Sequence, residues 1–381
     1  MQITNLTHTG RPSEPLDPRQ LEFGRMFTPN FFVTEYKNGE WRNPRIQPVE
    51  PFALHPASLV FHYCQTVFEG MKAFRQEDGR VVLFRPEMNA KRMQQSCARL
   101  SIPQIDEDFF IQAIRALVEN ERHFLPGEPG CLYIRPTAMG VDATLGVKSA
   151  SEFIFFILTL PSGGYFKGAG EGPGAIDVLV TRSVVRTAPG LMGGVKAGAN
   201  YAGTIKITEE AKAMGCAQVL FLDAHDHQYV EEMGGMNIMF VQNGGLRTPP
   251  VTTDTILRGV TRDSLLVLAR EHGLEVREDP ITIDELITGV KNGSITEMFA
   301  CGTAAVVIGI NSLRFEDEPS IRTAVGSPGP VTMKLYEALR GIQYGRVPDR
   351  HLWVYEVCPA HAGASVGRAT DAQGSLRATW T

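Results

Sequence analysis

The sequence predicts a two-domain α+β protein, and three observations lead to this prediction. At 381 residues the chain is longer than one hydrophobic core usually supports, so two domains are expected. Segments with strand and helix character alternate along the chain. Between the halves, a glycine-rich stretch interrupted by Pro173 cannot pack as a regular element. We therefore expect a small N-terminal domain over residues 1–165, a linker over 166–177 and a larger domain over 178–381.

In the N-terminal half, apolar and β-branched runs predict strands, and apolar residues at helical spacing predict helices. We expect strands at 31–36 and 81–84 and helices at 88–100 and 109–120. In the first of these helices Met93, Cys97 and Leu100 fall on one apolar face, which leaves Arg92 on the polar side.

In the C-terminal half, the same patterns predict strands at 178–185, 219–223 and 237–241 and helices at 204–215 and 261–273. Gly215 and Gly273 are expected to end the two helices, because glycine readily adopts the left-handed conformation of a helix C-terminus. Thr282 and Glu285 have the spacing of a capping box that opens a further helix.

Composition and charge exclude several classes of function. The 37 basic and 42 acidic residues are spread evenly and give a net charge of −5, so neither nucleic acid nor an anionic membrane is an expected partner. The longest apolar run, residues 153–160, is far shorter than the roughly 20 residues of a membrane helix. It predicts a buried strand that ends at Pro161. The N-terminus lacks the basic and apolar regions of a secretory signal.

The cysteines and one histidine cluster bear on metals and disulfides. Six dispersed cysteines without a C-x-x-C pair predict small buried side chains, neither disulfides nor a zinc site, and a reducing cytoplasm. Residues 223–227, Asp-Ala-His-Asp-His, contain residue types that bind metals, but no other candidate ligand converges on them in the sequence. We interpret this cluster as a polar hairpin turn and expect no metal.

Lys196 is the most suggestive single residue. It lies in GGVKAGANYAG, residues 193–203, where small neighbours leave its amine accessible. A partly desolvated lysine loses proton affinity and becomes a usable nucleophile. By itself the stretch is more typical of a flexible surface loop, and it lacks the Gly-Lys-Ser/Thr pattern of a nucleotide-binding loop.

Other stretches offer partners for a charged, phosphorylated cofactor. Glu231 and Glu232 run into a glycine pair and a buried strand, where a carboxylate could pair with the protonated ring nitrogen that pyridoxal phosphate requires; a polar hairpin end is the alternative. Val260 and Thr261 follow Gly259 at an expected helix start, where free N–H groups attract an anion, although a threonine-capped helix has the same pattern.

Two more features fit an anion. The small residues of CGTAAV, residues 301–306, let the N–H groups of a turn approach a carboxylate or phosphate. Arg92 could clamp a phosphate, whereas an arginine on the solvated face of its helix is the alternative.

Together and in this order, these stretches resemble the branched-chain amino-acid aminotransferases of fold type IV. The resemblance runs from residue 21 to the C-terminus. It rests on the motifs FEGMKAF (68–74), LFRPEMNAKRM (83–93), LYIRP (132–136), KAGANY (196–201), EMGGMN (232–237) and CGTA (301–304). It implies a β-barrel-like core in the larger domain and pyridoxal 5′-phosphate bound at the domain interface. The activity it implies is reversible amino transfer from leucine, isoleucine or valine to 2-oxoglutarate, which gives the branched 2-oxo acid and glutamate.

For the cofactor, the resemblance implies a role for each matching residue. Lys196 would hold the cofactor covalently and move a proton between the substrate Cα and the cofactor. Tyr201 would bind the phenolic oxygen, and Glu232, rather than Glu231, would keep the ring nitrogen protonated. The phosphate would be bound by Arg92, Val260, Thr261 and Thr303.

For the substrate, the resemblance implies a second set of residues. The α-carboxylate would bind the N–H groups of Ala304 and Ala305, helped by Tyr63. The branched side chain would lie in an apolar box, and Arg135 would meet the γ-carboxylate of glutamate. The box would be formed by Phe68, Tyr133 and Tyr165. Because some of these residues would come from a second subunit, a homodimer is expected.

Some positions and some alternatives stay open. Lys72 matches the family's F-E-G-x-K pattern, but the sequence gives it no chemical role. The positions of a redox C-x-x-C found in some eukaryotic relatives hold Ala305 and Ile308, so no thiol regulation is expected there. D-amino-acid transaminases and aminodeoxychorismate lyases share the lysine, the glutamate and the phosphate site, and they are the alternative within the cofactor class. A phosphate-binding module and a cofactor-dead relative are alternatives outside it, disfavoured by the missing nucleotide-binding patterns and by the presence of Lys196 and Glu232.

Overall fold

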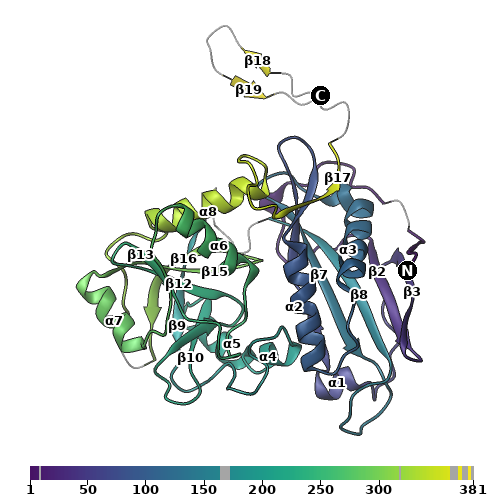
Figure 1. Ribbon diagram of the computed structural model, residues 1–381, viewed down its shortest axis with the longest axis horizontal. Helices are drawn as coiled ribbons and strands as arrows, with labels where there is room; N and C mark the ends of the chain where they lie inside the picture. Colours follow the sequence, from purple (N-terminus) through teal and green to yellow (C-terminus); the bar gives the residue numbers. More distant parts are fainter. Residues whose placement is uncertain (8–9, 164–171, 317–318, 361–367, 371–375, 379–381) are drawn as a thin grey trace.

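Two large sheets form the centres of two lobes, and helices pack around them (Figure 1). The computed structural model describes residues 1–7, 10–163, 172–316, 319–360, 368–370 and 376–378. Strands and helices are mixed in both lobes, as the predicted α+β class requires. A small pair, β18 (Arg368–Thr370) and β19 (Leu376–Ala378), lies outside the two large sheets.

The first sheet has nine strands and carries the N-terminal part of the chain. Its order is β1–β3–β2–β8–β7–β5–β6–β17, and β4 pairs with β7 beside this path. The strands are β1 (Thr4–Asn5), β2 (Asn30–Lys37), β3 (Glu40–Pro48), β4 (Thr66–Phe68), β5 (Met71–Arg75), β6 (Val81–Phe84), β7 (Cys131–Gly140), β8 (Phe153–Ser162) and β17 (Val354–Cys358). The strands predicted at 31–36 and 81–84 are therefore confirmed.

Strand β8 differs from its prediction at its end. It continues through Pro161 to Ser162, where Leu132 of β7 is the partner of Pro161. Strand β2 pairs with β8 only as far as Ile157, so β7 is the only strand beside Pro161. A proline that lacks an N–H is tolerated where a strand has a neighbour on one side only. The expected stop at Pro161 is wrong for this reason.

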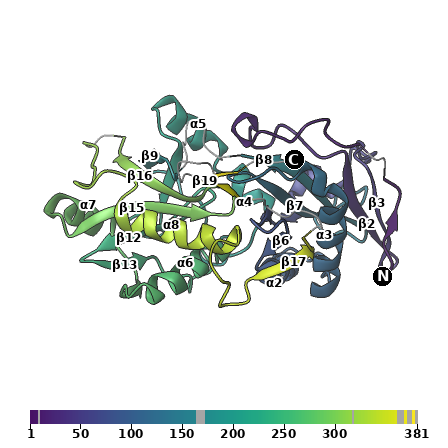
Figure 2. The same cartoon turned by 90° about the horizontal axis from the view of Figure 1, so that it is seen from above.

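Helices α2 (Pro86–Arg99) and α3 (Glu107–Glu121) cover one face of the first sheet (Figure 2). They confirm the helices predicted at 88–100 and 109–120. Met93 and Cys97 are buried in the core between these helices and the sheet, and Leu100 packs against it. Arg92 departs from its prediction, because only 7% of it is exposed although it was expected on the polar side. The short helix α1 (Leu59–Tyr63) and the 3-10 turns Pro18–Gln20 and Arg122–Phe124 complete this lobe.

The second sheet has eight strands in the order β11–β10–β9–β16–β15–β12–β13–β14. They are β9 (Ala175–Val180), β10 (Gln218–Leu222), β11 (Val230–Met233), β12 (Asn237–Gln242), β13 (Gly245–Thr248), β14 (Val276–Glu278), β15 (Ile295–Gly302) and β16 (Val306–Arg314). The edge strands β11 and β14 do not pair, but the N–H of Val230 bonds the carbonyl of Ile281, just beyond β14, at 2.9 Å. The sheet is therefore curled into an open, barrel-like core.

The helices of the second lobe are α4 (Gly198–Ala202), α5 (Ile205–Ala213), α6 (Val260–Glu271), α7 (Ile283–Asn292) and α8 (Pro330–Gln343). The predictions at 204–215 and 261–273 are confirmed, and Gly215 and Gly273 both have φ of +77°. The hydroxyl of Thr282 caps α7 by accepting from the N–H of Glu285 at 3.1 Å. The carboxylate of Glu285 accepts from Arg247 instead of completing the box.

Two segments depart from the predicted division of the chain. Strand β9 begins at Ala175, inside the expected linker, and ends at Val180 instead of 185. It ends there because the hydroxyl of Thr181 accepts from the N–H groups of Ser183 and Val184 and turns the chain. Strand β17 returns to the first sheet and pairs with β6. The boundaries 1–165, 166–177 and 178–381 themselves stay a prediction.

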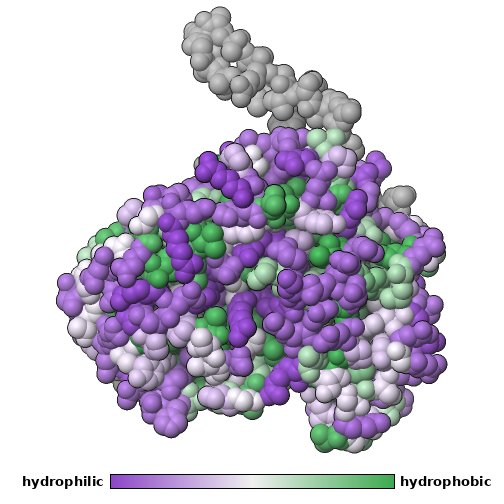
Figure 3. Space-filling view, viewed as in Figure 1, coloured by the Kyte–Doolittle hydropathy of each residue, from purple (hydrophilic) through white to green (hydrophobic). Residues whose placement is uncertain are grey.

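The two lobes share an apolar core. Phe74, Val82 and Phe84 of the first sheet belong to one buried cluster with residues of α6, α8, β15 and β16. This packing fixes the relative position of the lobes. Hydrophilic residues cover most of the face seen in Figure 3. Within the described part of the chain, no helix is long and apolar enough to cross a membrane.

Candidate active site

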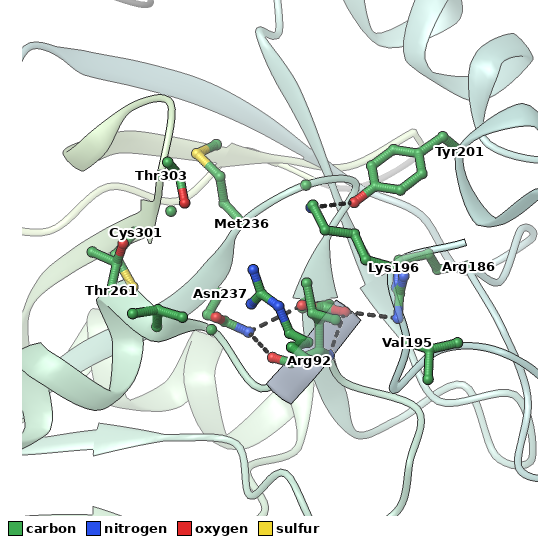
Figure 4. Close-up of a pocket in the computed structure, with 16 residues that line it drawn as sticks. Arg92, Arg186, Val195, Lys196, Tyr201, Met236, Asn237, Thr261, Cys301 and Thr303 are labelled. Carbon is green, nitrogen blue, oxygen red and sulfur yellow. Dashed lines mark hydrogen bonds and ion pairs between the residues drawn. The ribbon is translucent and has the colours of Figure 1, made fainter. Parts of the chain in front are cut away.

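A pocket lies where the two lobes meet, and both lobes supply its walls. Lys196 and Tyr201 lie on one side of it, and Thr261, Cys301 and Thr303 lie on the other (Figure 4). All seven residues that the sequence assigned to the cofactor line this pocket: Arg92, Lys196, Tyr201, Glu232, Val260, Thr261 and Thr303. The fold thus brings them together, while the role of each stays a prediction.

The backbone of Lys196 is held by the other lobe. Its N–H donates to the hydroxyl of Ser96 on α2 at 3.0 Å, and its carbonyl accepts from the N–H of Phe68 at 3.0 Å. Gly198 allows this close approach, since a Cβ there would lie 2.7 Å from the side chain of Thr66. A flexible surface loop is therefore the wrong interpretation of this stretch. No sequence pattern had pointed to Ser96.

The side chain of Lys196 reaches a hydroxyl and an aromatic face. Its Nζ donates to the hydroxyl of Tyr201 at 2.9 Å, and it lies 4.8 Å from the ring centre of Phe68. Helix α4 begins just after the lysine and carries Tyr201 back toward it. No carboxylate oxygen of the described residues lies within 4.0 Å of this Nζ. The amine thus faces the pocket with a hydroxyl as its partner.

Glu232 is the buried carboxylate of the pocket. Its Oε1 accepts from the N–H of Leu257 at 2.9 Å, and its Oε2 accepts from Asn237 at 3.0 Å. Arg186 lies 2.7 Å from Oε1 and forms an ion pair with it. Burial raises the pKa of Glu232, and the positive charge of Arg186 opposes that rise.

Glu231 is also buried but does not line the pocket. Burial raises the pKa of its carboxyl to about 6, with Thr255 and Arg186 opposing the rise. Its Oε2 has no hydrogen-bond partner among the described residues. The preference of the sequence analysis for Glu232 over Glu231 is consistent with this placement. It stays a prediction.

Arg186 is a pocket residue that the sequence analysis missed. Besides Glu232, its Nη2 donates to the carbonyls of Gly193 and Thr255. It therefore ties the segment before Lys196 to the segment before α6 while it neutralises the buried carboxylate. Nothing in its local sequence, RTAPG, signals this, because its partners come from distant segments.

Arg92 is held by a carboxylate that the sequence analysis also missed. Its Nε and Nη2 donate to the two oxygens of Glu69 at 2.7 and 2.8 Å, and its Nη1 donates to the carbonyl of Arg258 at 3.0 Å. Asn89 donates to Glu69 at 2.7 Å. Burial opposes ionisation of Glu69, but the charge and hydrogen bonds of Arg92 outweigh it and lower the pKa of this carboxyl. A solvated-face arginine is thus the wrong interpretation of Arg92.

The start of α6 lies at the far wall of the pocket, and no side chain caps its first N–H groups. Gly259 is the N-cap and has no side chain to bond the first N–H groups, and Thr261 lies inside the helix. The alternative of a threonine-capped helix is therefore wrong. A Cβ at Gly259 would lie 2.1 Å from Oδ1 of Asn237, which explains the glycine. The free N–H groups and the helix dipole favour a negatively charged group here.

The turn between β15 and β16 forms the rim near Thr303. The hydroxyl of Thr303 donates to the carbonyl of Gly70 at 3.0 Å, and Nζ of Lys72 donates to the carbonyl of Ala304 at 2.9 Å. The motifs FEGMKAF and CGTA, which are far apart in the sequence, thus meet at this turn. Val306, directly after it, has φ of +63°.

The residues predicted for the substrate are only partly assembled within one chain. Phe68 packs on Tyr201 at 5.0 Å, and the guanidinium of Arg135 lies 4.6 Å from the ring of Phe68. Arg135 donates to the hydroxyl of Tyr133 at 2.8 Å. Tyr63 does not line the pocket. It is half-exposed, and its hydroxyl donates to the carbonyl of Leu145 at 2.6 Å. Tyr165 lies outside the described residues.

The metal and disulfide predictions concern other parts of the chain. Asp223 accepts from four backbone N–H groups of residues 225–229, as expected of a polar turn. No group of candidate ligands that could hold a metal ion occurs within the described ranges. All six cysteines are free, and five of them are buried.

The sequence of this chain is similar to those of known aminotransferases. The family described as "Amino-transferase class IV" matches residues 66–313. Branched-chain-amino-acid transaminase 1 of Bacillus subtilis is 42% identical over 90% of this chain and 96% of its own length. A probable branched-chain-amino-acid aminotransferase of Streptomyces coelicolor is 41% identical over 87% of this chain and 91% of its own.

The fold of this chain is also similar to those of solved branched-chain amino acid aminotransferases. The branched-chain amino acid aminotransferase of Escherichia coli superimposes with a TM-score of 0.71 at 29% identity, covering 86% of this chain and 99% of its own. The PLP form of the enzyme from Thermobaculum terrenum gives 0.70 at 27% identity, covering 86% and 98%. The chain belongs to the class IV aminotransferases and, within them, to the branched-chain amino-acid aminotransferases.

Proposed function

We propose that this protein is a pyridoxal phosphate-dependent transaminase that moves the amino group of leucine, isoleucine or valine to 2-oxoglutarate. The observation that carries the proposal is the pairing of an accessible lysine amine, 2.9 Å from the hydroxyl of Tyr201, with an uncapped helix start across one pocket. The relatives described above carry the name of this activity.

The residues of the pocket fit pyridoxal phosphate. The start of α6 has free N–H groups for a phosphate, and Lys196 offers an amine for an aldehyde carbon. Glu232, which also lines the pocket, is a buried carboxylate that suits a protonated ring nitrogen. When bound, the cofactor supplies an electron-withdrawing ring that stabilises negative charge at the substrate Cα.

The chain's own residues then have distinct tasks. Lys196 would hold the cofactor. Once the substrate releases it, its Nζ would take the proton from the substrate Cα and pass it to the cofactor, and in the second half of the reaction it would move a proton from the cofactor back to Cα. Tyr201 orients this Nζ and binds the phenolic oxygen. Glu232, neutralised by Arg186, bonds the ring nitrogen. Val260, Thr261, Thr303 and Arg92 bind the phosphate.

The substrate is positioned by its two ends. The N–H groups of Ala304 and Ala305 bind the α-carboxylate, and Phe68, Tyr133 and Tyr165 enclose the branched side chain. Arg135 meets the γ-carboxylate of glutamate. Its Nε is buried without a hydrogen-bond partner among the described residues, which supports an additional acceptor at this point.

We also propose that the protein works as a homodimer. An exposed apolar surface lies on α1 and the segment after β7, and it is formed by Phe61, Tyr63, Leu145 and Val147. Of these, Val147 is 87% exposed. Apolar surfaces of this kind are typical of interfaces. Tyr63 is not among the residues that line the pocket of its own chain, and we propose that it serves the pocket of the second copy. A cytoplasmic location stays a prediction of the sequence.

The function is tested with the cofactor-loaded protein. The absorbance band of the lysine-bound cofactor should disappear when L-leucine is added without any oxo acid, and 2-oxoglutarate should restore it. Lys196→Ala should abolish turnover. D-amino acids that react as well as L-leucine would favour a D-amino-acid transaminase and contradict the proposal, as would wild-type turnover in Lys196→Ala.

A further inference from the structure

Lys72 is a buried lysine without a counter-ion. Only 7% of it is exposed, and no carboxylate oxygen of the described residues lies within 4.0 Å of its Nζ. Burial lowers the pKa of its ammonium group, with the nearby charge of Arg340 acting in the same direction. Removing an ammonium group from water without a carboxylate partner is costly, so a specific contact must retain it.

That contact is the carbonyl of Ala304. Nζ of Lys72 donates to it at 2.9 Å, and this is the hydrogen bond that the buried side chain makes across the lobes. Lys72 stands on β5, where its partner on β7 is Tyr133, so the strand pairing fixes where the lysine starts. Two residues earlier, the carbonyl of Gly70 accepts from the hydroxyl of Thr303 at 3.0 Å. The first lobe thus holds the turn of the second at two adjacent points.

The turn needs to be held, because its backbone is strained. Val306 follows the turn with φ of +63° and pairs with Gly302 across it. A β-branched residue rarely adopts the left-handed conformation, which hairpins of this length normally give to glycine. Such conformations persist only where the surroundings impose them.

The bond to Ala304 also sets the direction of a donor. In a trans peptide the C=O and the following N–H point in opposite directions. With the carbonyl of Ala304 directed at Lys72, the N–H of Ala305 points to the other side of the turn. Neither Ala304 nor Ala305 uses its N–H in a hydrogen bond within the described ranges. Both donors are therefore available to an anion.

We propose that Lys72 is a positioning residue for the substrate carboxylate. Its ammonium group fixes the Ala304–Ala305 peptide so that the free N–H groups of the turn bind the carboxylate of an amino or oxo acid. This proposal rests on the proposed transaminase function, and it gives a role to a residue that the sequence left without one.

Lys72→Met tests the proposal on the cofactor-loaded enzyme with two fragments of leucine. 4-Methylpentanoate has the carboxylate but no amine, and 3-methylbutylamine has the amine but no carboxylate. We expect the half-saturating concentration of 4-methylpentanoate to rise by about 10- to 100-fold, as for the loss of hydrogen bonds to a charged group. The half-saturating concentration of 3-methylbutylamine should change by less than about threefold. KM for leucine should rise more than kcat falls.

The controls separate this proposal from the function on which it rests. Lys91→Met removes an exposed lysine of α2 and should leave both fragments unaffected. Cofactor loading, measured by absorbance, should be retained in Lys72→Met. If Lys72→Met is insoluble, Lys72→Gln, whose side chain is one bond shorter, is measured in its place with the same expectation. Equal weakening of both fragments, or of neither, overturns the role of Lys72. A wild-type enzyme that does not react with leucine overturns the proposed function as well.

Discussion

Replacing Arg186 by methionine tests how the buried charge of Glu232 is compensated. Both side chains are 4% exposed, and Nη2 of Arg186 lies 2.7 Å from Oε1 of Glu232. The same guanidinium donates to the carbonyls of Gly193 and Thr255. Methionine fills much of the same space but offers no donor and no charge. It would leave one carboxylate and two carbonyl groups buried with fewer partners.

The expected loss of stability follows from this geometry. Removing one partner of a buried ion pair costs about 3–5 kcal/mol. The entropy of unfolding is about 2.1 cal/mol/K per residue, or about 0.8 kcal/mol/K for a chain of this length. We therefore expect the Tm of the cofactor-free protein to fall by about 4–6 °C. Because burial raises the pKa of Glu232 and Arg186 opposes it, the variant should also protonate Glu232 more readily.

Calorimetry of a double variant separates the charge effect from the loss of packing. In Arg186→Met/Glu232→Gln the carboxylate is removed together with its partner, so we expect at least half of the lost Tm to return. Arg322→Met, at an exposed position, serves as the control and should stay within about 0.5 kcal/mol of wild type. A double variant as unstable as the sum of its single changes would refute the idea that an uncompensated charge causes the loss.

Three further predictions address the anion site, a titrating carboxyl and the subunit interface. Gly259→Ala places a Cβ where Oδ1 of Asn237 is 2.1 Å away, so the affinity for pyridoxal phosphate should fall by about tenfold or more, or about 1.4 kcal/mol; an unchanged Kd in a fluorescence titration would contradict this. Burial raises the pKa of Glu231 to about 6, so its contribution to stability is fully present below the unfolded pKa of 4.5 and is lost as the pH rises through 6. Between these pH values the stability difference between wild type and Glu231→Gln should change by about 1–2 kcal/mol, and a constant difference in denaturant unfolding would argue against it. Leu145→Asp combined with Val147→Asp should shift the protein from dimer to monomer in sedimentation velocity, and an unchanged mass would exclude this surface as the interface.

Helices and strands were predictable from the sequence where the pattern that indicates them involves residues close together in the chain. The helices α2, α3, α5 and α6 follow from apolar periodicity, and the ends of α5 and α6 follow from a glycine. Both signals depend on residues a few positions apart. The end of β8 was not predictable in this way. Whether Pro161 stops a strand depends on how many neighbours the strand has at that point, and the sequence does not contain this information locally.

The site shows the same division between local and distant signals. Five of the seven residues predicted for the cofactor belong to a motif, and Val260 and Thr261 follow a glycine at an expected helix start. The fold brings all seven to one pocket. Ser96, Glu69 and Arg186 were missed because their partners, Lys196, Arg92 and Glu232, lie on other elements. Residues that position other residues can therefore be identified only once the folded structure shows which side chains they contact.

The charges of the pocket explain how an anion can be bound at so buried a place. Arg92 is paired with Glu69, and Arg186 is paired with Glu232, so these four groups add no net charge. Among the described residues, three of the five N–H groups of Arg92 donate to Glu69 and to the carbonyl of Arg258, and two have no acceptor. In the proposed phosphate site it would therefore contribute direction rather than net charge. The attraction that we propose for a phosphate comes from the uncapped start of α6 and from Lys196, which has no carboxylate within 4.0 Å in the described part of the chain. An aldehyde that carries a phosphate satisfies both at once, because its two ends match the amine on one wall and the free N–H groups on the other.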